Sequence, residues 1–210
     1  MPKAIWNTGI FKGVVINMAE QTKMMLAKAL RTVLEKKPLD KITISDLTNV
    51  CGVNRQTFYY HFHDIYDLIE WIYLTEANRA IGANKTYDTW QSGMLDMCNV
   101  MLKNKDFVAK TYHSRSGGHL GEIITNLSYD LLIGVVNEIS QGYSISEENK
   151  KFIANFYKFG YAGLLLQWVD NNMEEDPGIL VQKLEYLMEG NFLEAVKRYS
   201  CMERNKRRAI

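Results

Sequence analysis

The sequence is poor in proline and cysteine, and it has no long apolar run. Its three prolines among 210 residues, with many Leu, Met, Ala, Lys and Glu, predict an all-α fold. No apolar stretch approaches the roughly 18 residues that a membrane-spanning helix requires. The three cysteines, Cys51, Cys98 and Cys201, are far apart and form no CxxC pair, which is typical of reduced thiols. We therefore expect a helical, cytoplasmic protein with ordinary thiols.

Neither sign of charge dominates the whole chain, but the two parts of the chain differ. The formal net charge is +1, whereas residues 1–63 hold nine Lys/Arg against four Asp/Glu and residues 64–210 hold sixteen against twenty. A basic N-terminal part before an acidic remainder predicts a head that binds nucleic acid and a body that does not. Because the head is only mildly basic, two copies would be needed to collect enough phosphate contacts.

The segment Thr43–His63, TISDLTNVCGVNRQTFYYHFH, predicts two short helices with a tight turn between them. Thr43 with Asp46 forms a capping-box pattern, and Gly52 follows the last apolar residue, where a helix end favours positive φ. Asn54 can cap a second helix that runs to about Phe62. Two short amphipathic helices around a glycine turn are typical of a helix-turn-helix, whose second helix enters the major groove.

The outward residues of the second helix have the chemistry of DNA recognition. Arg55 can bond bidentately to guanine and Gln56 to adenine. Thr57, Tyr59 and Tyr60 offer hydroxyls to phosphates, which fix register rather than sequence. Any small helical domain has polar residues outside, and the two tyrosines could instead pack against the protein. The combination of cap, turn glycine and polar first turn favours DNA binding.

The pattern TxxDLxxxCGVNRxTFYYHFxD resembles the DNA-binding domain of the TetR family of bacterial transcription regulators, over roughly Gln21–Leu74. The resemblance implies base contacts along the first turns of the second helix and phosphate contacts around them. The expected DNA-binding residues are Thr43, Asn54, Arg55, Gln56, Thr57, Tyr59, Tyr60, His61 and His63. Many family members carry lysines where this chain has His63 and Ile65. Those phosphate contacts are weakened here, which leaves the helix N-terminal amides around Asp64 as an alternative anchor.

Four segments are expected along the chain: an arm or extension at 1–20, the helix-turn-helix domain at 21–66, a ligand-sensing and dimerisation domain at 67–200, and a frayed tail at 201–210. The arm could reach DNA through Lys3 and Lys12, or it could mark an upstream start codon or a weak signal peptide. Apolar periodicity predicts helices over Thr22–Lys36, Asp64–Ala80, Thr89–Lys103, Phe107–His113, His119–Ser140, Ser146–Asn171 and Pro177–Tyr199.

The last two predicted helices are the most hydrophobic, with apolar residues on more than one face of the first. Such a helix needs cover on several sides, either from the chain's own core or from a second copy. We favour a homodimer, whose twofold symmetry would place two recognition helices one DNA turn apart. The expected interface residues are Phe156, Gly160, Gly163, Leu164, Trp168, Leu184, Leu187 and Met188.

The resemblance also implies an effector pocket in the body. Candidates by composition are Trp90, Met94, Met97, Met101, Tyr112, His113 and Tyr129, although a Met and aromatic stripe at helical spacing is more often core. The polar run from Tyr112 to Arg115 before Gly117-Gly118 could be a pocket lip or a surface loop. The segments DIYDLIEWIY and GYAGLLLQWVDNNMEEDP are similar to regulators of dihydroxyacetone kinase operons. That resemblance implies regulators that can activate transcription and can rely on a partner protein as sensor.

An enzyme is the second class considered. His61 and His63 lie near Asp64 and Asp67, yet residues two apart on a helix point away from each other and no further ligand has motif spacing. There is no phosphate loop or nucleophile motif. We expect no enzyme, cofactor or metal. The prediction is a homodimeric regulator on a palindromic DNA operator, controlled by a small effector or a partner protein. The alternative is a TetR-fold co-regulator that senses a metabolite or partner without binding DNA.

Overall fold

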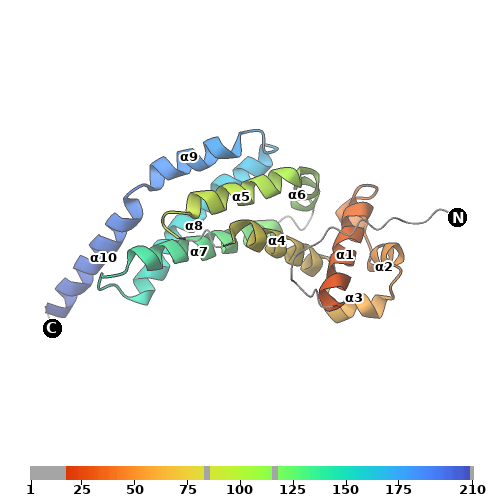
Figure 1. Ribbon diagram of the computed structural model, residues 1–210, viewed down its shortest axis with the longest axis horizontal. Helices are drawn as coiled ribbons and strands as arrows, with labels where there is room; N and C mark the ends of the chain where they lie inside the picture. Colours follow the sequence, from red (N-terminus) through yellow and green to blue (C-terminus); the bar gives the residue numbers. More distant parts are fainter. Residues whose placement is uncertain (1–17, 83–85, 115–117, 209–210) are drawn as a thin grey trace.

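The computed structural model describes residues 18–82, 86–114 and 118–208. Within these ranges every regular element is a helix, which confirms the predicted all-α fold (Figure 1). In chain order the elements are α1 (Met18–Leu34), the 3-10 turn η1 (Leu39–Lys41), α2 (Ile44–Cys51), α3 (Arg55–His61), α4 (Ile65–Ile81), α5 (Trp90–Lys103), α6 (Lys105–Tyr112), α7 (Gly118–Ile139), α8 (Glu147–Asp170), α9 (Pro177–Met188) and α10 (Asn191–Arg208). The expected arm over residues 1–17, with Lys3 and Lys12, lies outside the described residues.

Helices α1, α2 and α3 form a head at one end of an elongated molecule (Figure 1). Leu26 and Leu30 of α1, Leu47 of α2 and Phe58 of α3 have no exposed surface and make up the centre of the head. Burying one such side chain contributes roughly 1.5–3 kcal/mol, so four in contact fix the three helices against one another. The head is therefore a packed scaffold on which α3 is held in place.

The predicted caps of the head are present in the structure. Thr43 accepts a hydrogen bond from the N–H of Asp46, whose carboxylate accepts one from the N–H of Thr43, which closes a capping box on α2. Gly52 ends α2 with φ +69°, a conformation that favours glycine. Asn54 then caps α3 by accepting from the N–H of Thr57. These local contacts set where α2 stops and where α3 begins.

The body extends from α4 to α10 (Figure 1). Helix α7 packs along α8, α5 packs against α4 and α9, and α10 packs against α7 and α8. Leu132, Val135 and Val136 of α7 and Leu165 of α8 are fully buried between these layers. Helix α4 belongs to both parts, because it contacts α1 on one side and α5 and α7 on the other. It is the continuous connection between head and body. Across the described ranges, no helix combines the length and apolar character needed to cross a membrane.

The C-terminal region differs from its prediction in two ways. The predicted helix Pro177–Tyr199 is two helices, because α9 ends at Met188 and Gly190 turns the chain with φ +74°. The expected frayed tail is also wrong as far as Arg208, since α10 continues to that residue. Glu203 on α10 accepts hydrogen bonds from the backbone N–H of Ser146 at 2.8 Å and from Asn149 at 2.5 Å. The tail is thus tied to the start of α8.

Candidate nucleic-acid interface

Helix α3 divides its residues between the core and the surface. Phe58 is fully buried, whereas Tyr59 is 51% exposed and Tyr60 is 83% exposed. Arg55 and Gln56, in the first turn, are also exposed. Arg55 Nη2 donates to the Tyr59 hydroxyl oxygen at 3.4 Å, so the two side chains lie together on one face. The exposed face of α3 presents a guanidinium, an amide and two phenols to the solvent.

The cap of α3 uses some of the expected DNA-binding groups internally. Asn54 Oδ1 accepts from the backbone N–H of Thr57 at 2.7 Å and from the Thr57 hydroxyl at 3.0 Å. The Thr57 hydroxyl proton is therefore committed to Asn54. The amide N–H groups of Asn54 have no such bond and are the donors this pair can offer to an anion.

Thr43 is held in a similar way at the start of α2. Its hydroxyl donates to Asp46 Oδ2 at 2.8 Å, and Lys37 Nζ lies 2.6 Å from the same oxygen. The hydrogen bonds from Lys37 and Thr43 lower the pKa of Asp46 from 3.8 to about 2. Thr43 is exposed, but its hydroxyl serves the helix cap, so a phosphate there would have to compete with Asp46.

Backbone amides at the start of α4, suggested as an alternative phosphate anchor, already have partners within the protein. The N–H groups of Tyr66 and Asp67 donate to Asp64 Oδ1 at 2.8 and 2.9 Å, and the N–H of His63 donates to Asp67 Oδ2 at 2.8 Å. These amides already bind carboxylates of the protein, whose negative charges would repel a phosphate. These amide donors are therefore occupied by the helix cap that Asp64 and Asp67 form.

The two histidines of the HxH sequence lie in different settings. His61 is half-buried at the end of α3 with its ring 5.0 Å from that of Tyr60, and His63 is exposed in the turn that follows. In the part of the chain that the structure describes, no three His, Cys, Asp or Glu side chains are grouped to hold a metal ion. His61 and His63 flank the exposed face of α3 and extend it toward α4.

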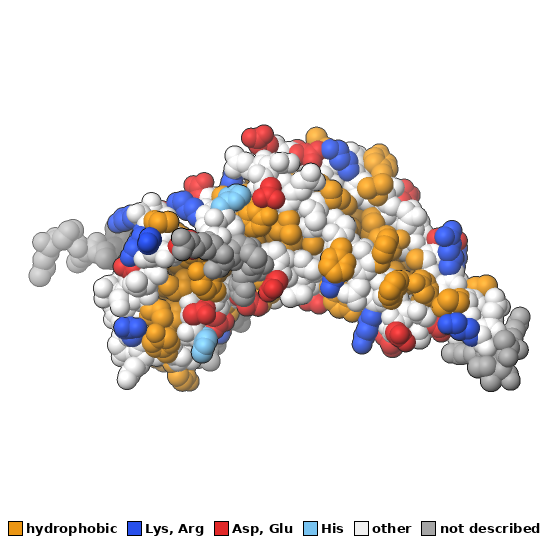
Figure 2. Space-filling model, turned by 180° about the vertical axis from the view of Figure 1, so that it is seen from behind, with side chains coloured by type: hydrophobic (Ala, Val, Ile, Leu, Met, Phe, Trp, Pro, Cys, Tyr) orange, Lys and Arg blue, Asp and Glu red, His pale blue; other side chains and the backbone are white. Residues whose placement is uncertain are grey.

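The residues expected at a dimer interface separate into two groups. Phe156 is 68% exposed, Leu187 65% and Leu164 36%, and Gly160 and Gly163 lie on the same exposed face of α8. A Cβ built on either glycine would meet no atom of this chain. The three other expected residues, Trp168, Leu184 and Met188, are at most 6% exposed, because they pack inside the protomer. Hydrophobic side chains gather across the body when the molecule is seen from behind (Figure 2).

The residues expected to bind a ligand do not form one site. Met97 and Met101 line a cavity between α4, α5 and α7, whereas Met94 is fully buried and Trp90 borders a separate groove near α9. Burial raises the pKa of Tyr112, and so does the hydrogen bond that its hydroxyl donates to Asp170 at 3.1 Å. His113 is exposed. Tyr129 lies under Lys158, 5.4 Å from its Nζ. The expected lip over residues 115–117 lies outside the described ranges.

Comparison with known proteins shows which proteins this chain resembles. Residues 88–190 match a family model described as the C-terminal region of a TetR-type transcriptional regulator. The HTH-type dhaKLM operon transcriptional activator DhaS of Lactococcus lactis subsp. lactis is 28% identical over 91 residues. The family match shows a TetR-type C-terminal region over residues 88–190 of this chain. The alignment with DhaS of Lactococcus lactis covers 43% of this chain and 49% of that relative, so the chain spans about half the relative's length.

One solved structure shares the fold over most of the chain. The dihydroxyacetone kinase operon activator DhaS superposes with a TM-score of 0.62 at 20% identity, over 85% of this chain and 97% of that chain. The TetR-family repressor AlkX from Dietzia, implicated in biodegradation of n-alkanes, gives a TM-score of 0.48 at 16% identity over 82% of this chain and 97% of that chain. The first superposition covers most of this chain, so the fold of this protein is shared over most of its length.

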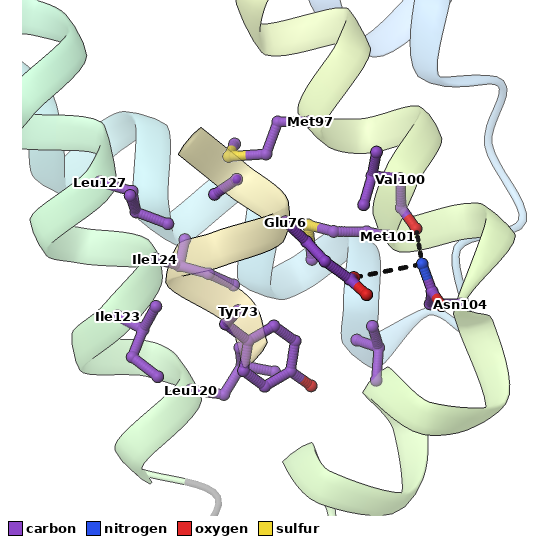
Figure 3. Close-up of a pocket in the computed structure, with 12 residues that line it drawn as sticks. Tyr73, Glu76, Met97, Val100, Met101, Asn104, Leu120, Ile123, Ile124 and Leu127 are labelled. Atoms are coloured by element: carbon purple, nitrogen blue, oxygen red, sulfur yellow. Dashed lines mark hydrogen bonds between the residues drawn. The ribbon is translucent and has the colours of Figure 1, made fainter. Parts of the chain in front are cut away.

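The cavity between α4, α5 and α7 has an apolar wall and a polar end (Figure 3). It is small, about 30 Å³, which is room for one or two water molecules. At the polar end, Asn104 Nδ2 donates to Glu76 Oε2 at 3.3 Å. The residues missed by sequence reasoning include Tyr73, Glu76, Asn104, Leu120, Ile123, Ile124 and Leu127. Their helical spacing on α4 and α7 indicated only burial, which does not distinguish a cavity wall from core.

Proposed function

We propose that this TetR-family regulator binds a palindromic operator in double-stranded DNA as a homodimer in the cytoplasm. One α3 from each protomer enters the major groove. A small effector or a partner protein controls the DNA-competent form through α4. The relatives named DhaS are activators of dihydroxyacetone kinase operons, and we extend from them only the role of operon regulator.

The exposed face of α3 carries the proposal of DNA binding. Its base-reading groups, Arg55 and Gln56, are the exposed residues of the first turn, which is the part of a recognition helix that meets base edges. Tyr59 and Tyr60 add hydroxyls beside them at 51% and 83% exposure. Because Phe58 anchors the same helix in the core, these groups are held on a rigid support.

The apolar face of α8 and α9 supports a homodimer. Phe152, Phe156 and Phe159 of α8 are each more than half exposed, an arrangement that a monomer rarely keeps in water. A groove of about 300 Å³ runs between α8 and α9, with Leu164 and Leu187 at its border and Trp168 at its wall. Gly160 and Gly163 leave room for close approach of a partner helix. A second copy of the same face would cover this apolar surface.

Control through α4 is supported by its position. The helix begins directly after α3, contacts α1, and supplies Tyr73, Glu76 and Ala77 to the cavity of the body. A change at the cavity therefore acts on the same rigid element that supports the head. Such a change shifts the balance between DNA-competent and incompetent forms by the ligand's preference for one of them.

The experiment is selection of bound fragments from the genome of the organism that carries the gene. Wild-type protein should enrich a small set of sites with two related half-sites, centred roughly 10 base pairs or a multiple apart. The variant with Arg55→Ala and Gln56→Ala, which leaves Phe58 in place, is the control and should enrich nothing.

A co-regulator that does not bind DNA is the second candidate function. It would show no enrichment with wild-type protein and the same background as the double variant. The exposed arginine and amide of α3 favour the DNA-binding function, because a co-regulator that does not bind DNA would have no use for these groups.

A further inference from the structure

A polar cluster around Arg31 ties the head to the body, and we call it the latch: Arg31, Glu76, Asn104 and Phe107. Arg31 Nη2 donates to Glu76 Oε1 at 2.5 Å, and Nη1 donates to Asn104 Oδ1 at 3.0 Å. The guanidinium carbon lies 4.2 Å from the centre of the Phe107 ring. The latch joins α1 of the head to α4 and to the α5–α6 turn of the body.

The latch separates the cavity from an open groove. Glu76 and Asn104 line the cavity, whereas Arg31 and Asn104 line a groove of about 390 Å³ between α1 and the start of α6. Figure 3 shows Glu76 directed toward Asn104 at the end of a wall that is otherwise apolar. Asn104 belongs to both spaces, and Arg31 donates to it from the groove.

The lining of the cavity selects the chemistry of a ligand. Glu76 is the charged residue among those that line it, and Leu120, Ile123, Ile124 and Leu127 form an apolar wall opposite. A carboxylate at the end of an apolar channel attracts a cation that can also donate hydrogen bonds. Met97 and Met101 have flexible, unbranched side chains that can move aside for a guest. The free space by itself holds only one or two water molecules, so an unbranched aliphatic amine enters as these methionine side chains move aside.

An ammonium group and Arg31 would compete for Glu76. Two cations on one carboxylate repel each other at short range, so an amine that pairs with Glu76 displaces Arg31. The displaced guanidinium would find Glu35, just past the end of α1, and Asp106, because both carboxylates line the groove. A carboxylate ligand would instead place its charge beside Glu76. With an amine, each carboxylate and each cation still has a partner of opposite charge after the exchange. With an acid, two negative charges would lie side by side.

We propose that compact apolar amines bind in this cavity through Glu76, in competition with Arg31, and that the exchange frees α1 of the head from the body. The inference rests on the proposed function in one respect, because release of the head has a regulatory effect only if the head binds DNA. By linkage, anything that opens the latch strengthens amine binding, and the amine opens the latch in turn.

The test is calorimetric titration of the full chain, without DNA, with n-hexylamine, hexan-1-ol and hexanoate at pH 7 and fixed ionic strength. The amine should bind about tenfold more tightly than the alcohol, and hexanoate should not bind, because a charged hydrogen bond adds to the apolar contact. Glu76→Gln should remove the preference for the amine. Tighter binding of hexanoate, no binding of the amine, or an unchanged preference in Glu76→Gln would overturn the proposal.

A second variant makes the competition visible as a gain of affinity. Arg31→Gln removes the competitor and should tighten amine binding about three- to tenfold, as expected for a partly exposed ion pair. Damage to the fold would not produce such a gain. Lys103→Gln is the matched control, because Lys103 lines the same groove without touching Glu76, and it should leave amine affinity unchanged. Equal gains in both variants, or no gain in Arg31→Gln, would contradict the exchange.

The DNA arm of the experiment uses the fragment selected by the wild-type protein. Amine on wild type and Arg31→Gln without amine should shift fragment affinity in the same direction, and amine should not shift Arg31→Gln further. Shifts in opposite directions, or none, would overturn the release of the head. If wild type selects no DNA, the proposed function fails while calorimetry still decides the amine site. If DNA is selected and the amine does not bind, only the inference fails.

Discussion

Helices α3 and α8 both expose aromatic side chains, and the two surfaces differ in one kind of atom. On α3 of the head the exposed rings are Tyr59 and Tyr60, which carry hydroxyls beside Arg55 and Gln56. On α8 of the body they are Phe152, Phe156 and Phe159, which carry none. A phenol and a guanidinium remain hydrated until a polar partner replaces the water, whereas a phenyl ring gains from any apolar cover. The comparison teaches that the head is suited to a polyanion and the body to a copy of itself.

The largest expected effect comes from placing a charge on the apolar surface. Phe156→Arg should convert the dimer to a monomer, because a second copy would bury the new guanidinium without a partner. DNA affinity should fall roughly 100-fold or more, since two linked heads bind far more tightly than one. Sedimentation and DNA-binding measurements on the same samples check both effects.

The control for that variant is Asn137→Arg, which adds the same charge at an exposed position on α7. It should leave both the dimer and DNA binding unchanged. A Phe156→Arg protein that remains dimeric would show that α8 is not the interface.

The next effect is specific to the head. Arg55→Ala should cost about 1–3 kcal/mol of binding to the selected site and relax the preference at one base position, because a bidentate contact to guanine is lost. Binding titrations against a panel of single-base variants measure this. Arg79→Ala, at an exposed arginine of α4, should have little effect. Equal losses on the selected site and on random DNA would remove Arg55 from base recognition.

A smaller effect is expected from one hydroxyl. The Tyr59 oxygen accepts from Arg55, so its own proton is available for a phosphate. Tyr59→Phe should weaken binding to all sequences by about 0.5–1.5 kcal/mol, the net contribution of one hydrogen bond. Titrations at fixed salt on selected and random DNA test it, with Tyr143→Phe as a control in the body. Affinity unchanged on both DNAs would exclude the phosphate contact.

The smallest effect concerns stability of the head rather than binding. Because the pKa of Asp46 falls from 3.8 to about 2 in the folded protein, its ionised form stabilises the fold above pH 3.8 and this contribution disappears as the pH falls to about 2. Asp46→Asn should be less stable than wild type near pH 5, and the difference should shrink toward pH 2. Denaturation curves across this range measure it. Asp130→Asn, at an exposed aspartate of α7, controls for general loss of charge, and a difference that grows toward pH 2 would contradict the assignment.

The head could be predicted in detail because its determinants are local. The capping box of Thr43 and Asp46, the turn at Gly52 and the cap at Asn54 each depend on residues within four positions of one another. The occupied amides at the start of α4 were missed, since a sequence does not show whether Asp64 binds the amides of its own helix or leaves them for a ligand.

The body could be predicted in outline only. Sequence pattern indicated that α8 and α9 are hydrophobic, but not that Leu187 is exposed while Leu184 and Met188 face inward, because several faces of these helices are apolar. The pairing of Arg31 with Glu76 joins residues 45 positions apart, and no local sequence pattern predicts it. The features that could not be predicted are those that depend on tertiary packing.

The bond from Glu203 to the start of α8 bears on the order in which the molecule forms on the ribosome. Domains near the N-terminus fold first during synthesis, so α1 to α3 can pack around Phe58 while α10 has not yet been made. The backbone N–H of Ser146 and the amide of Asn149 must wait for Glu203, which is translated more than fifty residues later. The nascent chain thus acquires its head before Glu203 secures the start of the helix that presents the apolar surface.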